Sequence, residues 1–122
     1  MELINFSVRE KIFSITALVI LTGKDVIVIV SGGREHIGAV GVSLPALSHV
    51  SGELSSSTSV ITVAPHKEDV VVKLIGERLA KSLNRTVSVI AGIHFDNLKK
   101  EDIDTILNCC EKLTLKIIDR LG

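Results

Sequence analysis

The sequence contains very few aromatic side chains: Phe6, Phe13 and Phe95 are present, and tryptophan and tyrosine are absent. Proteins that bind single-stranded nucleic acid usually stack the bases on aromatic rings, so this class of function is disfavoured. The charges point the same way, because 14 basic and 14 acidic residues cancel. No basic stretch offers the positive face that a phosphate backbone requires. We therefore expect no nucleic-acid partner.

Cysteines and long apolar runs are also scarce. The two cysteines, Cys109 and Cys110, are adjacent, so they cannot close a loop and do not have the spacing of a zinc or redox pair. We expect them to be structural, reduced thiols of a cytoplasmic protein. The longest apolar runs, residues 17–21 and 26–30, are each five residues long, whereas a membrane span needs about 20. The first residues do not resemble a secretory signal, and we expect no membrane partner.

Apolar residues are nevertheless abundant. They make up 46% of the chain, and the mean hydropathy is +0.45, which is high for a soluble protein of 122 residues. A chain of this length forms one domain, here residues 1–122, and buries roughly two-thirds of its unfolded surface. The apolar surplus predicts a partner surface, most simply a second copy of the chain.

The first half of the sequence has the two-residue period of strands. We predict strands at residues 3–8, 11–21, 25–31, 37–44 and 58–63, with a hairpin turn at residues 22–25. The strand at 25–31 is apolar on both faces, which is typical of a central or covered strand. Residues 44–57 are polar and rich in turn-forming residues, so we predict a surface loop there.

The second half changes to helical periodicity. We predict a helix at residues 68–83 that Asn84 ends, a strand at 86–93, and an amphipathic helix at 99–121 with Asn97 as its N-cap. The fold class is therefore α+β: a mostly antiparallel meander of about six strands with two helices packed on one face. Because two helices cover only one face, the other face needs a cover, and we predict a homodimer.

Three of the four histidines stand where a predicted strand ends or begins, which is where rigid scaffolds usually present functional groups. His36 follows Gly32 and Gly33, and these glycines leave room for a ligand near backbone N–H groups. The simpler interpretation of this segment is a hairpin loop.

His66 and Lys67 precede the first predicted helix. Unpaired N–H groups at a helix start attract anions, and Lys67 adds a positive charge. Glu68 and Asp69 follow in the first turn, where they complement the helix dipole and would repel a phosphate. A well-capped helix start is therefore the alternative interpretation.

His94 ends the last predicted strand, and Asp96 follows two residues later. Asp96 is placed to orient His94, and such a pair permits general base chemistry, although no spacing fixes a nucleophile. A metal site formed by His36, His66 and His94 is geometrically possible, but it lacks a recognisable ligand spacing.

Residues 36–40, 66–69 and 92–97, in this order and spacing, resemble the LpdD-like proteins. These are regarded as chaperones for the prenylated flavin of non-oxidative hydroxyarene decarboxylases, and they look like relatives of the small, dimeric α+β proteasome assembly chaperones. The resemblance covers residues 12–121. It implies a non-enzymatic accessory protein, dimeric through its sheet, that assists cofactor delivery to a decarboxylase or its maturation. It also implies a pocket formed by His36, His66, Lys67, His94 and Asp96, beside Gly32 and Gly33.

The resemblance implies no permanently bound cofactor, and prenylated flavin mononucleotide is the candidate ligand. Its phosphate would lie near Lys67, and its ring would lie on aliphatic side chains. Two alternatives stay open. One is a small hydrolase or lyase that uses His94 and Asp96, with a metal held by His36 and His66. The other is a protein-assembly chaperone that acts through its apolar sheet face or its last helix and binds no small molecule.

Overall fold

The computed structural model describes residues 1–47, 52–63 and 68–122. Six strands and two helices follow one another along the chain. They are β1 (Glu2–Glu10), β2 (Phe13–Thr22), β3 (Asp25–Gly33), β4 (Ala39–Leu47), β5 (Leu54–Thr62), α1 (Asp69–Leu83), β6 (Val87–His94) and α2 (Lys100–Leu121). The predicted α+β class with two helices is confirmed.

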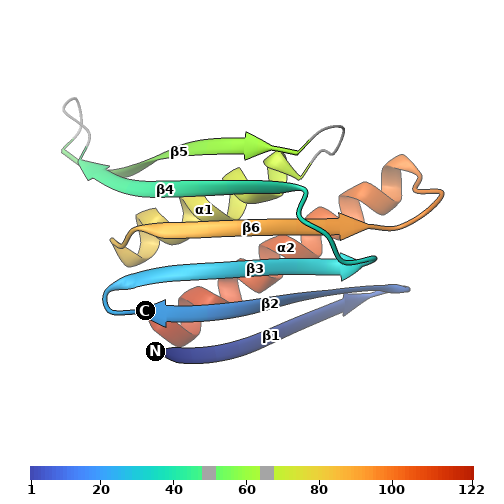
Figure 1. Ribbon diagram of the computed structural model, residues 1–122, viewed down its shortest axis with the longest axis horizontal. Coiled ribbons are helices and arrows are strands. Elements are labelled where there is room, and N and C mark those ends of the chain that lie inside the picture. Colours follow the sequence, from blue (N-terminus) through green and yellow to red (C-terminus); the bar gives the residue numbers. More distant parts are fainter. Residues whose placement is uncertain (48–51, 64–67) are drawn as a thin grey trace.

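The strands form one mixed sheet in the order β1-β2-β3-β6-β4-β5 (Figure 1). The last strand of the chain, β6, lies between β3 and β4, parallel to β3 and antiparallel to β4. The prediction of a simple meander was therefore wrong for the middle of the sheet. Because β6 is apolar along most of its length, burial favours a central position over an edge.

The predicted loop at residues 44–57 was also wrong at both of its ends. Residues 44–47 belong to β4 and residues 54–57 to β5, and the two strands pair from Ala39↔Thr62 to Leu47↔Leu54. Pro45 suggested a loop because proline cannot donate a ladder hydrogen bond. In the structure β4 pairs with β6 only up to Ser43, so Pro45 lies beyond that ladder and its missing N–H costs no bond to β6.

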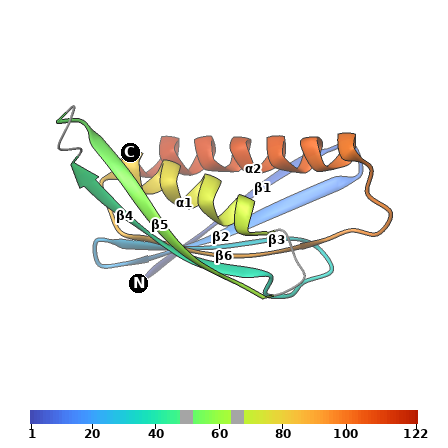
Figure 2. The same cartoon turned by 90° about the horizontal axis from the view of Figure 1, so that it is seen from above.

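Both helices lie on the same side of the sheet (Figure 2). Asn84 ends α1 in the left-handed conformation (φ 53°), as predicted. Asn97 is also left-handed (φ 58°), but it does not cap α2. The N-cap is Lys99, whose backbone N–H donates to a carboxylate oxygen of Asp102 at 3.0 Å. The capping prediction was therefore two residues too early.

The covered side of the sheet, here called the helix face, carries the core. Alternate strand residues such as Ile15, Val28 and Val89 point toward α1 and α2 and are at most 1% exposed. Glycines let α1 approach closely: a Cβ added at Gly41 would lie 2.3 Å from a methyl of Val72, and one at Gly76 would lie 2.3 Å from the Ser43 hydroxyl. Strand β4 and helix α1 therefore pack so closely at these two glycines that no larger residue fits.

The opposite side, here called the open face, has the intervening residues. It includes Leu18, Ile29, Ile90, Val40 and Val42, which are partly or largely exposed. Neither helix packs on this side (Figure 2). Within the described residues, no helix is long and apolar enough to cross a membrane.

Candidate functional site

The connection between β3 and β4, residues 34–38, has to cross the end of β6 because β6 lies between these two strands (Figure 1). It crosses at Gly92, where an added Cβ would lie only 1.6 Å from the carbonyl oxygen of His36. The backbone N–H of Gly38 then donates to the carbonyl of Ala91 at 2.8 Å. Glycine at position 92 is therefore what lets the chain bring His36 onto the end of β6.

Both ring nitrogens of His36 lie near acceptor oxygens. Nε2 is 3.0 Å from Oε1 of Glu68, and Nδ1 is 3.2 Å from the carbonyl oxygen of Arg34. Contacts on both edges therefore hold the ring between these two oxygens. The ring is thereby fixed in position at the crossing.

Glu68 occupies the N-cap position of α1, makes no side-chain cap hydrogen bond, and is only 5% exposed. A Cβ at Gly38 would lie 2.4 Å from its carboxylate carbon, so the missing side chain at Gly38 makes room for this group. The sequence suggested that Glu68 serves the helix dipole. In the structure its carboxylate instead pairs with His36 across the end of the sheet.

His94 stands beside His36, with ring centroids 6.0 Å apart and the rings at 84°. Its Nε2 is 3.2 Å from Oδ1 of Asp96, so Asp96 orients His94 as expected. Arg34 donates to the other oxygen of Asp96 at 3.5 Å. The side chains of Arg34 and Asp96 are 73% and 68% exposed, against 24% for His36. The cluster therefore combines a largely buried contact, His36–Glu68, with a solvent-facing ion pair, Arg34–Asp96.

The structure brings together His36, His94 and Asp96 from the predicted set. His66 and Lys67 lie outside the described residues. Gly32 and Gly33 border the cluster, but they serve close packing: an added Cβ would lie 2.5 Å from Ile15 at Gly32 and 2.1 Å from the His94 carbonyl oxygen at Gly33. Their role as ligand contacts stays a prediction.

A hollow of about 240 Å³ opens next to His36 on the open face. Its walls are aliphatic, and its polar groups include the hydroxyls of Thr16 and Ser31, which are 3.0 Å apart. We call it the open-face hollow. It is lined by Asn5, Thr16, Leu18, Ile29, Val30, Ser31, Glu35, His36, Ile37, Ile90 and Gly92.

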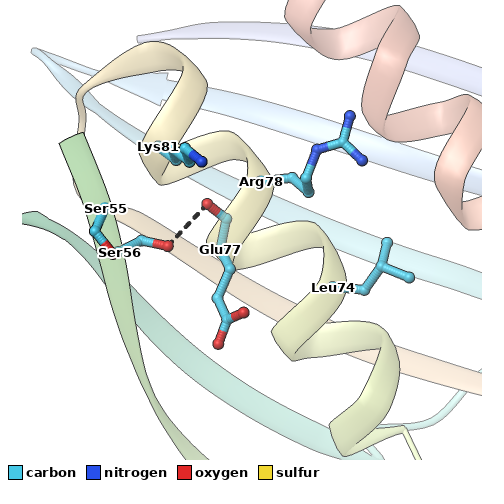
Figure 3. A pocket seen from close by; sticks show the side chains of 6 residues that line it. All are labelled: Ser55, Ser56, Leu74, Glu77, Arg78 and Lys81. Atoms are coloured by element: carbon cyan, nitrogen blue, oxygen red, sulfur yellow. Dashed lines mark hydrogen bonds between the residues drawn. The ribbon is translucent and has the colours of Figure 1, made fainter. Parts of the chain in front are cut away.

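Two further hollows lie on the helix side of the sheet. One, of about 380 Å³, lies between β5 and α1 and is lined mainly by serines and exposed charged residues (Figure 3). Ser56 donates there to the carbonyl of Glu77 at 3.0 Å. The other, of about 250 Å³, is an apolar cleft between the starts of α1 and α2, and Glu68 contributes to its lining. Neither hollow is lined by His36 or His94.

Sequence reasoning missed two members of the cluster, Arg34 and Glu68. Arg34 follows Gly32-Gly33 directly, so its place in the same short segment as His36 was the available signal. Glu68 had no such signal, because its pairing with His36 joins residues far apart in the sequence. Within residues 1–47, 52–63 and 68–122, no group of three or more histidine, cysteine, aspartate or glutamate side chains is arranged to hold a metal ion.

The cysteines take no part in this cluster. Burial, followed by the neighbouring Cys109, raises the pKa of Cys110 to about 12. Burial is also the main cause of the raised pKa of Cys109, with the carboxylate of Glu10 adding to it. Thiolates are the reactive form of cysteine, so both residues are structural, as predicted.

The family model of the prenylated flavin chaperone LpdD-like domain matches residues 9–122. The chain belongs to this family. A chain from the crystal structure of a chaperone complex for yeast 20S proteasome assembly has the same fold, with a TM-score of 0.66 over 99% of this chain and 98% of that one. The two are 13% identical in sequence, so this likeness concerns the fold alone. A comparison with curated proteins finds no significant match.

Proposed function

We propose that this protein is a non-enzymatic chaperone that binds prenylated flavin mononucleotide reversibly and assists its delivery to a decarboxylase or the maturation of that enzyme. The observation that carries this proposal is the match of nearly the whole chain to the prenylated flavin chaperone family. The cluster of His36 and His94 beside the open-face hollow supports it, because it gives the chain polar groups next to an aliphatic surface.

The residues of the open-face hollow fit the ring of such a ligand. Leu18, Ile29 and Ile90 present aliphatic surface to a flat ring, and Thr16 and Ser31 present hydroxyls to its polar edge. When bound, the prenylated flavin would supply the decarboxylase's chemistry, and the chaperone would only hold it. Arg34, at the exposed side of the cluster, is placed to meet an anionic group.

The remaining predicted contacts belong to the same proposal. Gly32, Gly33, His66 and Lys67 are the other candidate ligand contacts, with Lys67 for the phosphate. We further propose that the protein works in the cytoplasm as a homodimer joined through its open face. Its protein partner would be the decarboxylase subunit that receives the cofactor.

Titration calorimetry of the purified protein with flavin mononucleotide and with its prenylated form tests the proposal. We expect saturable binding of the prenylated form, and binding at least about tenfold weaker in the double variant His36→Ala/His94→Ala, since polar contacts of about 1.4 kcal/mol correspond to a factor of ten. Lys81→Ala, in the hollow of Figure 3, is the matched control and should bind normally.

The other outcomes separate the alternatives. If neither flavin binds while a decarboxylase still associates with the double variant, the protein-assembly chaperone without a ligand is favoured. If the protein turns over a substrate and His94→Ala or Asp96→Asn abolishes turnover, the His94–Asp96 pair, which is 3.2 Å apart, acts as base and orienting group, and the non-enzymatic proposal fails.

A further inference from the structure

The open-face hollow combines aliphatic and polar groups in one lining. Leu18, Ile29 and Ile90 give it aliphatic walls, while its polar and charged lining comes from Asn5, Thr16, Ser31, Glu35 and His36. On a solvent-exposed surface such a mixture carries no penalty. Under a covering surface, however, each polar group has to find a hydrogen-bond partner or lose free energy. If another surface covers the open face, the polar groups of the hollow therefore need hydrogen-bond partners from that surface or from a bound ligand.

Charge and area both favour a second copy as the cover. Between the terminal residues of strands β2 to β6, the open-facing positions carry no lysine, arginine, aspartate or glutamate, although 23% of the chain is charged. In a two-fold interface the same patch meets itself, and strand positions without charge do so without like-charge repulsion; Glu35, from the connection between β3 and β4, is the acidic residue that lines the hollow. These five strands of about nine residues span roughly 700 Å², near the ~800 Å² per partner of a stable interface.

The volume of the hollow shows that one copy is not enough for a nucleotide-sized ligand. Sites that enclose such molecules usually measure about 300–1,000 Å³ and bury most of the ligand, whereas this hollow measures about 240 Å³ and is open on one side. A ring lying on Leu18, Ile29 and Ile90 would leave its other face in water. Side chains fill the roughly 10 Å between two packed sheets, so a flat ring fits between two copies only where small residues leave a hollow, as Thr16, Ser31 and Gly92 do here.

We infer that the open-face hollow is one half of a ligand chamber that a second copy of the chain completes, so that flavin binding and dimerisation strengthen each other. This inference rests on the proposed function. The ligand supplies partners to the polar groups that the interface would otherwise bury, and the second copy covers the exposed face of the ligand. Such coupling is reciprocal: the factor by which the ligand tightens the dimer equals the factor by which dimerisation tightens ligand binding.

Sedimentation equilibrium of the full chain over a dilution series, with and without prenylated flavin mononucleotide, measures how strongly the ligand tightens the dimer. We expect the ligand to tighten the dimer at least tenfold. A chain that stays monomeric at every concentration in the presence of bound ligand overturns the inference, and so does a dimer whose dissociation constant the bound ligand leaves unchanged.

The variant Val42→Lys tests the reciprocal effect, that of dimerisation on flavin binding. Val42 is 43% exposed on the open face and does not line the hollow. A lysine there places like charges in the two-fold interface without touching the ligand contacts. We expect a monomer that binds the flavin at least tenfold more weakly. Leu115→Lys, at a 52% exposed position on α2, is the matched control and should leave both constants unchanged.

A folding control and two outcomes separate this inference from the proposed function. Circular dichroism and the melting temperature show whether Val42→Lys is folded, and Ile61→Lys, at a 75% exposed open-face position, replaces it if it is not. A folded monomeric variant that binds the flavin as tightly as the wild type overturns the chamber and leaves the proposed function intact. A wild-type dimer that binds no prenylated flavin overturns the proposed function, and the chamber with it.

Discussion

The two faces of the sheet are made of the same kinds of residue, but they differ in what covers them. On the helix face, valine, isoleucine and alanine are almost completely buried under α1 and α2. On the open face, leucine, isoleucine and valine alternate with serine and threonine and remain partly exposed. The helix face accounts for the stability of the single chain, whereas the open face holds the hollow and both histidines of the cluster. Stability and binding are therefore assigned to opposite sides of the same strands.

The largest effect is expected for Gly92→Ala. At Gly92 the backbone of His36 packs against the open face as closely as side chains pack in the core. The added Cβ would lie 1.6 Å from the His36 carbonyl oxygen, and the backbone would have to move. We expect a loss of about 3 kcal/mol or more in the free energy of unfolding, measured by urea denaturation. Gly23→Ala, with φ at 63° and open space around it, should cost only about 1 kcal/mol.

Two isoleucines in β2 compare the faces directly. Ile15 is 0% exposed on the helix face, and Ile20 is partly exposed on the open face. Ile15→Ala should cost about 3 kcal/mol of unfolding free energy, and Ile20→Ala about 1 kcal/mol or less in dilute solution. An equal loss at both positions in the monomer would contradict the contrast between the faces. A cost of Ile20→Ala that grows with protein concentration would show that a second copy covers it.

The two histidines provide a smaller contrast. His36→Ala removes a partner of the Glu68 carboxylate, which is 5% exposed, so we expect a loss of about 2 kcal/mol in unfolding free energy. His94 pairs with Asp96, whose side chain is 68% exposed, and His94→Ala should cost less than about 0.5 kcal/mol. Thermal melts of the two variants provide the comparison. A larger loss of unfolding free energy for His94→Ala than for His36→Ala would contradict the conclusion that the His36–Glu68 contact is the more stabilising of the two.

The smallest effect is expected at the cysteines, which pack on the helix side. With the pKa of Cys110 raised to about 12, on the order of one thiol in 10⁴ is ionised at pH 8, and a thiol-alkylating reagent should label the native protein hardly at all. Labelling should rise as the pH increases from about 9 toward 12, and both thiols should react in denaturant. Rapid labelling of the folded chain at pH 8 would mean that the helix face opens.

Local pattern accounts for most of what the sequence predicted correctly. The two-residue alternation predicted the strands at residues 11–21 and 86–93, and Asn84 ended α1 as expected. The position of β6 was not predictable in this way, because periodicity assigns a face to a residue but not a neighbour to a strand. Pro45 and the serines of residues 55–57 are typical of turns, so the adjoining ends of β4 and β5 were not predicted. Pairing between the two strands, rather than strand propensity, stabilises these ends. The contact of His36 with Glu68 was hidden for the same reason, since it depends on strand order.

The insertion of β6 between β3 and β4 also constrains how the protein is made. Residues 1–62 leave the ribosome as two separate groups of strands, β1–β3 and β4–β5, which β6 alone joins into one sheet. Until residues 87–94 have been synthesised, the facing edges of β3 and β4 remain unpaired, and unpaired edges are prone to association between chains. The pairings with the largest sequence separation, those of β6 with β3 and β4, then form in one late step, which predicts slow folding for a domain of this size. A nascent chain stalled before residue 87 should accordingly be the aggregation-prone species.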